Sequence, residues 1–125
     1  MGRFQFGQIV EVRISDTAGR MKERPALIIS SDEENDLGMS LQVLAITKSI
    51  QNPRPSYHVP VHHDWNKNPK TGLYAPCVVK CNWLREIEQN KVLCSLGYLP
   101  IDVLEIIVSE FDKLYNDPNF NDWVS

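Results

Sequence analysis

The chain has 125 residues and a mass of 14.3 kDa, which gives room for one hydrophobic core and too little for two domains. Its 42% hydrophobic, 23% charged and 9% aromatic residues exclude a collagen-like, coiled-coil or disordered chain. No run approaches the roughly 18 apolar residues of a membrane span, and no signal peptide is recognisable at the start. We therefore expect one cytoplasmic domain over residues 1–125, with a core at about 6–115 and a tail at 116–125.

Charge is distributed unevenly along the chain. The net charge is −3, from 13 Lys and Arg against 16 Asp and Glu. Up to Gly97 there are 12 basic and 10 acidic residues, whereas the remainder has one base and six acids. Attraction to phosphate is screened over about 10 Å at moderate salt, so a polyanion such as RNA would approach the first part of the chain.

The first half of the chain predicts short strands separated by turns. Residues 9–14 mix apolar and polar positions as a strand does, and 15–23 form a polar loop. The continuous apolar run 26–30 predicts a strand buried on both faces, and 41–47 predicts a third strand after a turn-rich segment. This spacing favours a small antiparallel barrel or sandwich over alternating strands and helices.

The second half adds further strands and one helix. Pro60 limits the segment 57–61 to an edge strand, and a loop at 64–72 separates it from strands at 77–81 and 91–96. A helix is expected from about Pro100 to Tyr115, because proline is tolerated in a first helical turn. Apolar residues recur there at helical spacing: Leu104, Ile107, Val108, Phe111, Leu114 and Tyr115. In the tail, Phe120 and Trp123 are the side chains that could dock.

Metal and disulfide chemistry are disfavoured. The three cysteines are too few for a disulfide scaffold, and we expect reduced, buried thiols at Cys77, Cys81 and Cys94. A zinc site would have to use His58, His62, His63 and Asp64. Strand alternation separates His62 from His63, whereas a closed zinc site needs four converging ligands. We expect no metal and no cofactor, and no Walker or G-x-S-x-G motif is present.

Two positions are candidates for contact with phosphate. Arg24 lies at the junction of a polar loop and a buried strand, where its planar guanidinium could face a groove. The alternative is a structural arginine that caps a carbonyl or pairs with Glu23. Thr47 ends an apolar strand just before Lys48, which would bring a hydroxyl and an ammonium to one end of the sheet, although threonine is also a common strand residue.

The order of these pieces resembles the MazF/PemK/Kid family of toxins from bacterial toxin–antitoxin pairs. The matching segments are Phe6-Gly7-Gln8-Ile9-Val10, Arg24-Pro25-Ala26-Leu27-Ile28-Ile29-Ser30, Ala45-Ile46-Thr47, Gly72-Leu73 with Pro76-Cys77-Val78, and Gly97-Tyr98-Leu99 before the helix. The resemblance covers about Phe6 to Tyr115. It implies a mainly β, SH3-like antiparallel barrel with a C-terminal helix, acting as a metal-independent endoribonuclease on single-stranded RNA.

The resemblance also implies roles for particular residues. Arg24 would stabilise the phosphorane, Thr47 would hold the scissile phosphate, and Lys80 would neutralise developing charge. RNA-contacting residues would be Arg20, Lys22, Lys48, Asn82, Trp65 and Tyr57. One branch of the family has Arg-Cys-Asp where this chain has Lys80-Cys81-Asn82, and that aspartate is implied to be the general base. Asn82 cannot accept a proton, so either another group takes the 2′-hydroxyl proton or cleavage is slow.

The partners are implied in the same way. They are a second copy of the chain and a cognate antitoxin, with which the toxin binds DNA and whose tail would occupy a groove lined by Arg20, Lys22, Arg24 and Lys48. A rival hypothesis is a non-enzymatic module of the same fold, similar to the CcdB gyrase poisons, that grips a protein target.

Overall fold

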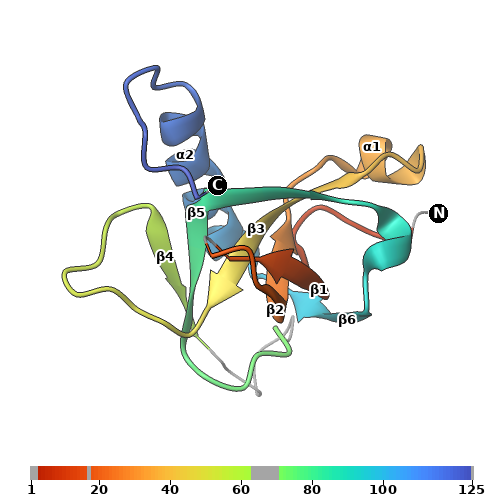
Figure 1. Ribbon diagram of the computed structural model, residues 1–125. Coiled ribbons are helices and arrows are strands. Elements are labelled where there is room, and N and C mark those ends of the chain that lie inside the picture. The colour runs from red at the N-terminus through yellow and green to blue at the C-terminus, as the bar shows by residue number, and fades with distance from the viewer. Residues whose placement is uncertain (1–2, 17, 63–70, 125) are drawn as a thin grey trace.

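The computed structural model describes residues 3–16, 18–62 and 71–124. It contains one six-stranded antiparallel sheet in the order β4-β5-β3-β2-β1-β6, curled into a half-barrel and packed against a C-terminal helix (Figure 1). The strands are β1 (Gln8–Ser15), β2 (Met21–Ile28), β3 (Leu41–Thr47), β4 (His58–Val61), β5 (Cys77–Ile87) and β6 (Cys94–Tyr98). The helices are α1 (Asp32–Asp36), the 3-10 turn η1 (Gln89–Lys91) and α2 (Ile101–Tyr115). This confirms the predicted barrel fold with its closing helix.

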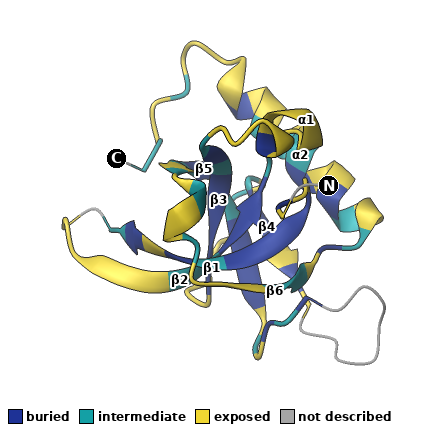
Figure 2. Cartoon of the chain, turned by 90° about the vertical axis from the view of Figure 1, so that its right-hand side faces the viewer, coloured by how far each residue is buried: buried dark blue, intermediate teal, exposed yellow. Residues whose placement is uncertain are grey.

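Apolar residues on the two faces of the sheet form two cores. The helix-side core includes Ile9, Leu27 and Leu44, and α2 covers it with Leu104, Ile107 and Leu114. The second core lies on the other face and is built from residues that alternate with the first set: Val10, Val12, Ala26, Ile28, Val43, Ala45 and Trp83. Burial on both faces of the central strands is why β2 and β3 have continuous apolar runs (Figure 2).

Most predicted elements are confirmed, with differences that have local causes. The predicted loop 15–23 is shorter, because Met21–Glu23 already belong to β2 although all three are exposed, as Figure 2 shows. Their pairing with β1, rather than burial, makes them strand. The turn 31–38 contains α1, which begins with a capping box between Ser31 and Glu34.

Two further predictions concern the edge strand and the C-terminal tail. β4 is an edge strand, and Pro60 is exposed there. In the tail, Phe120 and Trp123 dock as the sequence allowed, because both pack against the helix-side core. No helix among the described residues is long and apolar enough to cross a membrane.

Candidate active site

The antiparallel register brings Arg24 and Thr47 together. Ala26 of β2 pairs with Ala45 of β3, and continuing this antiparallel register two residues back along β2 and two forward along β3 sets Arg24 opposite Thr47. Arg24 is the fourth residue of β2 and pairs with Val12, so it does not lie at a loop junction as predicted. Both side chains fall on the face of the second core, at the end of the sheet where the apolar residues stop.

Arg24 and Thr47 line one pocket of about 330 Å³. Lys22 and Lys48 also line it, and Glu11 and Glu23 are the acids among its lining residues. The Thr47 hydroxyl accepts a hydrogen bond from the Ser49 backbone N–H at 3.2 Å, which leaves its own proton for a ligand. The lining of the pocket therefore carries three cations against two acids, with a hydroxyl donor beside them.

Gly72 forms part of the pocket wall and cannot be replaced without movement. Its φ is +74°, a left-handed conformation that favours glycine, and a Cβ there would overlap the carbonyl oxygen of Leu96. The Gly72-Leu73 pair, one of the segments shared with the toxin family, is thus explained by close packing of this wall on β6.

A large bulge in β5 creates the second part of the site. Between the pairs Leu44–Leu84 and Ile46–Val79, β3 advances by two residues while β5 advances by five. The extra residues lie within the segment 80–83, which contains Lys80, Asn82 and Trp83. Bulges re-aim side chains, and as a result Trp83 packs in the second core although Cys81, two residues earlier, belongs to the helix-side core.

Three cations surround the indole ring of Trp83. The guanidinium carbon of Arg24 is 5.0 Å from a ring centroid of Trp83, the ammonium of Lys80 is at 5.6 Å, and the guanidinium carbon of Arg85 is at 5.9 Å. The negative face of an aromatic ring attracts such groups, which partly offsets their mutual repulsion. Burial, with the added charge of Arg24, lowers the pKa of Lys80, so keeping this lysine charged reduces the stability of the folded protein.

The partnerless buried polar atoms of the described side chains gather at this site. They are Nε of Arg24, Nδ1 of His58, Oδ1 of Asn82 and Nε1 of Trp83. Arg24 also has no ion pair with a described residue, because Glu23 pairs instead with Arg13 at 3.7 Å. Buried polar groups are nearly always hydrogen-bonded, so a concentration of exceptions indicates a place where another molecule supplies the partners.

His58 is the titratable base next to Asn82. It pairs with Lys80 across β4 and β5, and only 3% of it is exposed. Burial is the main cause that lowers the pKa of His58, and the positive charges of Lys80 and, to a smaller extent, Arg54 add to it, while the neighbouring Asn82 side chain opposes the shift. The imidazole is therefore neutral at pH 7. The sequence indicates His58 only as a candidate metal ligand, because its position opposite Lys80 depends on the pairing of β4 with β5.

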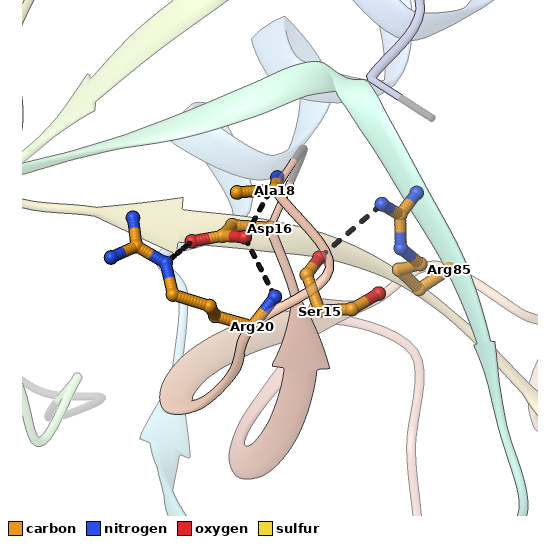
Figure 3. A network of polar contacts seen from close by, with 5 residues as sticks. All are labelled: Ser15, Asp16, Ala18, Arg20 and Arg85. Atoms are coloured by element: carbon orange, nitrogen blue, oxygen red, sulfur yellow. Dashed lines mark hydrogen bonds and ion pairs between the residues drawn. The ribbon is translucent and has the colours of Figure 1, made fainter.

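Arg20 does not line the pocket. Its guanidinium pairs with Asp16 at 3.4 Å, and the same carboxylate accepts the backbone N–H groups of Ala18 and Arg20 (Figure 3). These bonds lower the pKa of Asp16, chiefly through the Arg20 N–H. Of the predicted groove, Lys22, Arg24 and Lys48 are therefore together, and Arg20 is separate. In the same view Arg85 reaches the Ser15 carbonyl, at 3.4 Å.

The remaining candidate residues fall in different places. Tyr57 is half-buried and meets the rings of His58 and Phe120 edge-on, and Trp65 lies outside the described residues. Within the described ranges no three His, Cys, Asp or Glu are grouped as a metal site would require; His63 and Asp64 lie outside them.

The cysteines are free, and two of the three are buried. Burial, with a contribution from Glu110, raises the pKa of Cys81 to about 12, which makes this thiol unreactive. The prediction of a buried thiol is wrong for Cys94, which is exposed on β6.

Solved structures place this fold among the MazF toxins. MazF from Deinococcus radiodurans matches with a TM-score of 0.71 and 20% identity, over 91% of this chain and 97% of that one. The Mycobacterium tuberculosis toxin MazF-mt6 matches with 0.68 and 20% identity, over 87% and 96%. A mycobacterial endoribonuclease in complex with its cognate antitoxin matches with 0.70 and 14% identity, over 92% and 97%. Comparison with curated protein sequences gave no significant match.

The family is settled by sequence. Residues 5–115 match the family described as the PemK-like, MazF-like toxin of type II toxin–antitoxin systems, and this chain belongs to that family. The resemblance in the short sequence segments is thereby confirmed.

Proposed function

We propose that this toxin is an endoribonuclease that cleaves single-stranded RNA without a metal ion. The observation that carries the proposal is the convergence of Arg24 and Thr47, from two separate family motifs, on one cationic pocket. Unpaired RNA is the substrate that suits it, because a flexible strand can lay a phosphate in the pocket and expose its bases. Such a substrate also places the activity in the cytoplasm.

The reaction is an internal transesterification. The ribose 2′-oxygen forms a bond to the adjacent phosphorus, and the bond from phosphorus to the 5′-oxygen breaks, which leaves a cyclic phosphate and a 5′-hydroxyl. Arg24 and Lys80 stabilise the charge that develops on the phosphorane oxygens, and the Thr47 hydroxyl donates to the phosphate. A well-placed donor of this kind contributes about 2.7–4 kcal/mol to the transition state. Lys22 and Lys48 bind neighbouring phosphates.

The 2′-hydroxyl proton needs an acceptor, and the 5′-oxygen needs a donor. Asn82 carries no titratable group, but the neutral imidazole of His58 lies beside it with a free Nδ1. We assign the acceptor role to His58, and the donor role to Lys80, whose lowered pKa makes it a stronger acid than an exposed lysine.

The test is cleavage of a mixed pool of unstructured RNA by purified protein in EDTA, with 5′ ends mapped. We expect recurrent cuts at one short motif that persist in EDTA and leave cyclic phosphates. The matched control is Thr47→Val, which keeps the shape of the side chain and removes its hydroxyl. Activity that disappears with chelator and returns with magnesium would contradict the mechanism. Intact RNA would favour the CcdB-like binding module.

Two partners belong to the proposal. A cognate antitoxin would place an acidic segment over Lys22, Arg24 and Lys48, competing with RNA for the same positive potential. Toxicity on expression, relieved by the neighbouring gene, would test this.

A second copy of the chain would cover the apolar side chains exposed along α2, among them Ile101 and Ile106, which are 67% and 54% exposed. Sedimentation at micromolar concentration should give twice 14.3 kDa, and a monomer there would contradict it.

A further inference from the structure

The C-terminal tail returns from α2 to the bulge of β5. The Val124 N–H donates to the Asn82 carbonyl at 2.8 Å, and the Asn82 side-chain amide donates to the Asp122 carbonyl at 2.8 Å. The Arg85 guanidinium donates to the Val124 carbonyl at 3.0 Å. Figure 1 shows the C-terminus beside β5. The tail thus continues the edge of the sheet beyond β4.

Aromatic contacts hold the tail against the rest of the protein. Phe120 meets Tyr57 edge-on at 5.3 Å and Trp123 at 5.4 Å between ring centroids, and Trp123 meets Phe111 of α2 at 6.1 Å. Val124 packs against the second core, which contains Trp83. All three of these tail side chains are half-buried, whereas the residues between and before them are exposed.

These contacts use groups that the proposed RNA site needs. Asn82 and Tyr57 are candidate RNA contacts, and the tail engages both. The oxygens that the tail offers to Asn82 and Arg85 are acceptors, as are phosphate and base oxygens, so tail and RNA satisfy the same donors. His58 is only 3% exposed and meets Tyr57, the ring that Phe120 of the tail contacts. A ribose hydroxyl can reach the imidazole only if this edge of the sheet opens.

We propose that residues 117–124 are a self-binding strap that occupies the Asn82 end of the RNA site and must be displaced before RNA can be held and cut. The inference rests on the proposed function, since it regulates the same site. The strap carries two acids, Asp117 and Asp122, and no base. Once it leaves the cationic site, it would be repelled by the bound strand rather than attracted back to it.

The first experiment measures the strap directly, without catalysis. The probe is a mixed pool of 2′-O-methyl RNA oligonucleotides, which lack the nucleophile and cannot be cleaved. Hydrogen exchange of the Val124 amide, protected by the Asn82 carbonyl, is followed with and without the probe. We expect protection to be lost on binding. A Val124 amide that stays protected while the probe is bound overturns the inference.

The second experiment loosens the strap by the double substitution Phe120→Ala and Trp123→Ala. Neither residue is among the proposed catalytic or RNA-contacting residues, and Asn121→Ala, at an exposed tail position, is the matched control. Losing the three aromatic contacts of these residues should tighten probe binding and speed cleavage at low RNA by about 2–10-fold. Circular dichroism verifies that the barrel remains folded. Unchanged or weaker binding by a folded double variant overturns the strap.

The outcomes separate the two proposals. If the probe releases the tail but natural RNA is not cleaved, the strap stands and the endoribonuclease proposal fails. If RNA is cleaved while Val124 remains protected, the endoribonuclease stands and the strap fails. Absence of probe binding by wild type and double variant alike overturns both.

Discussion

Replacing Arg24 by alanine should slow catalysis strongly while leaving the fold largely intact. In the structure the guanidinium lies over Trp83 at 5.0 Å and has no ion pair with a described residue. The substitution therefore loses one partly desolvated cation–π contact, worth about 1–2 kcal/mol. It also relieves repulsion of Lys80 and removes the buried, partnerless Nε. The net loss in free energy of unfolding should be at most about 2 kcal/mol, or roughly 3–8 °C in Tm.

The effect on rate should be much larger than the effect on stability. Losing a donor that acts on the transition state costs about 2.7–4 kcal/mol, or two to three orders of magnitude in cleavage rate. The assay is single-turnover cleavage of a fluorescent RNA in EDTA, normalised to folded protein, beside a thermal melt. A variant that melts far below wild type but cleaves normally per folded molecule would show that Arg24 is structural.

Arg24→Lys separates charge from geometry at the same position. Lysine keeps the cation near Trp83 and so should retain wild-type stability, but it lacks the planar fork that contacts two phosphate oxygens. We expect a cleavage rate between the rates of the wild type and the alanine variant. Full activity in Arg24→Lys would refute a bidentate role and leave only the need for positive charge.

Three further predictions concern the walls of the site. Gly72→Ala should lower the free energy of unfolding, measured by chemical denaturation, by about 2–5 kcal/mol, because both the left-handed φ and the Leu96 carbonyl oppose a Cβ there. The control Gly38→Ala, at φ +78° in open space, should lower it by about 1–2 kcal/mol. Equal losses would contradict the packing argument. Lys80→Met should raise the free energy of unfolding at pH 7 by about 0.5–2 kcal/mol, since burial disfavours the charge of this lysine. The same substitution should lower the cleavage rate. A large drop in Tm would be inconsistent with this account. Because the pKa of His58 is lowered in the folded protein, the unfolded chain binds this proton more readily. The stability that His58 contributes is therefore present above about pH 6.5 and is lost as the pH falls further. His58→Gln should make the free energy of unfolding, measured by urea titration at several pH values, fall less steeply towards acid pH, and an unchanged slope would exclude His58 as its source.

The sequence was sufficient for the elements whose pattern is repeated over several residues. Leu41–Thr47 and the helix after Pro100 lie where the apolar spacing predicts them. Pro60 identified the edge strand, because its missing N–H is tolerated only there. Family motifs added Arg24 and Thr47, and the antiparallel register explains how both reach one pocket.

What the sequence could not show depends on pairing between distant strands. Residues 80–83 have the alternation of a regular strand, so nothing local indicates a bulge, and without it Trp83 would be expected beside Cys81. The exposed, charged start of β2 at Met21 looks like loop because its order comes from β1. By contrast, the capping box of Ser31 and Glu34 is a local helix signal that the sequence carries by itself.

The cation cluster around Trp83 connects these observations. Arg24 and Lys80 approach one ring with no carboxylate ion pair among the described residues, and burial lowers the pKa of the lysine. Two unpaired cations at this site make the folded protein less stable than neutral side chains would. A bound anion therefore lowers the free energy of the folded protein. The described part of the tail offers neutral carbonyl oxygens to Asn82 and Arg85, and it forms no ion pair with Arg24 or Lys80. A phosphate satisfies both the charge and the hydrogen-bond donors, which is the physical reason that RNA should win the competition for this edge of β5.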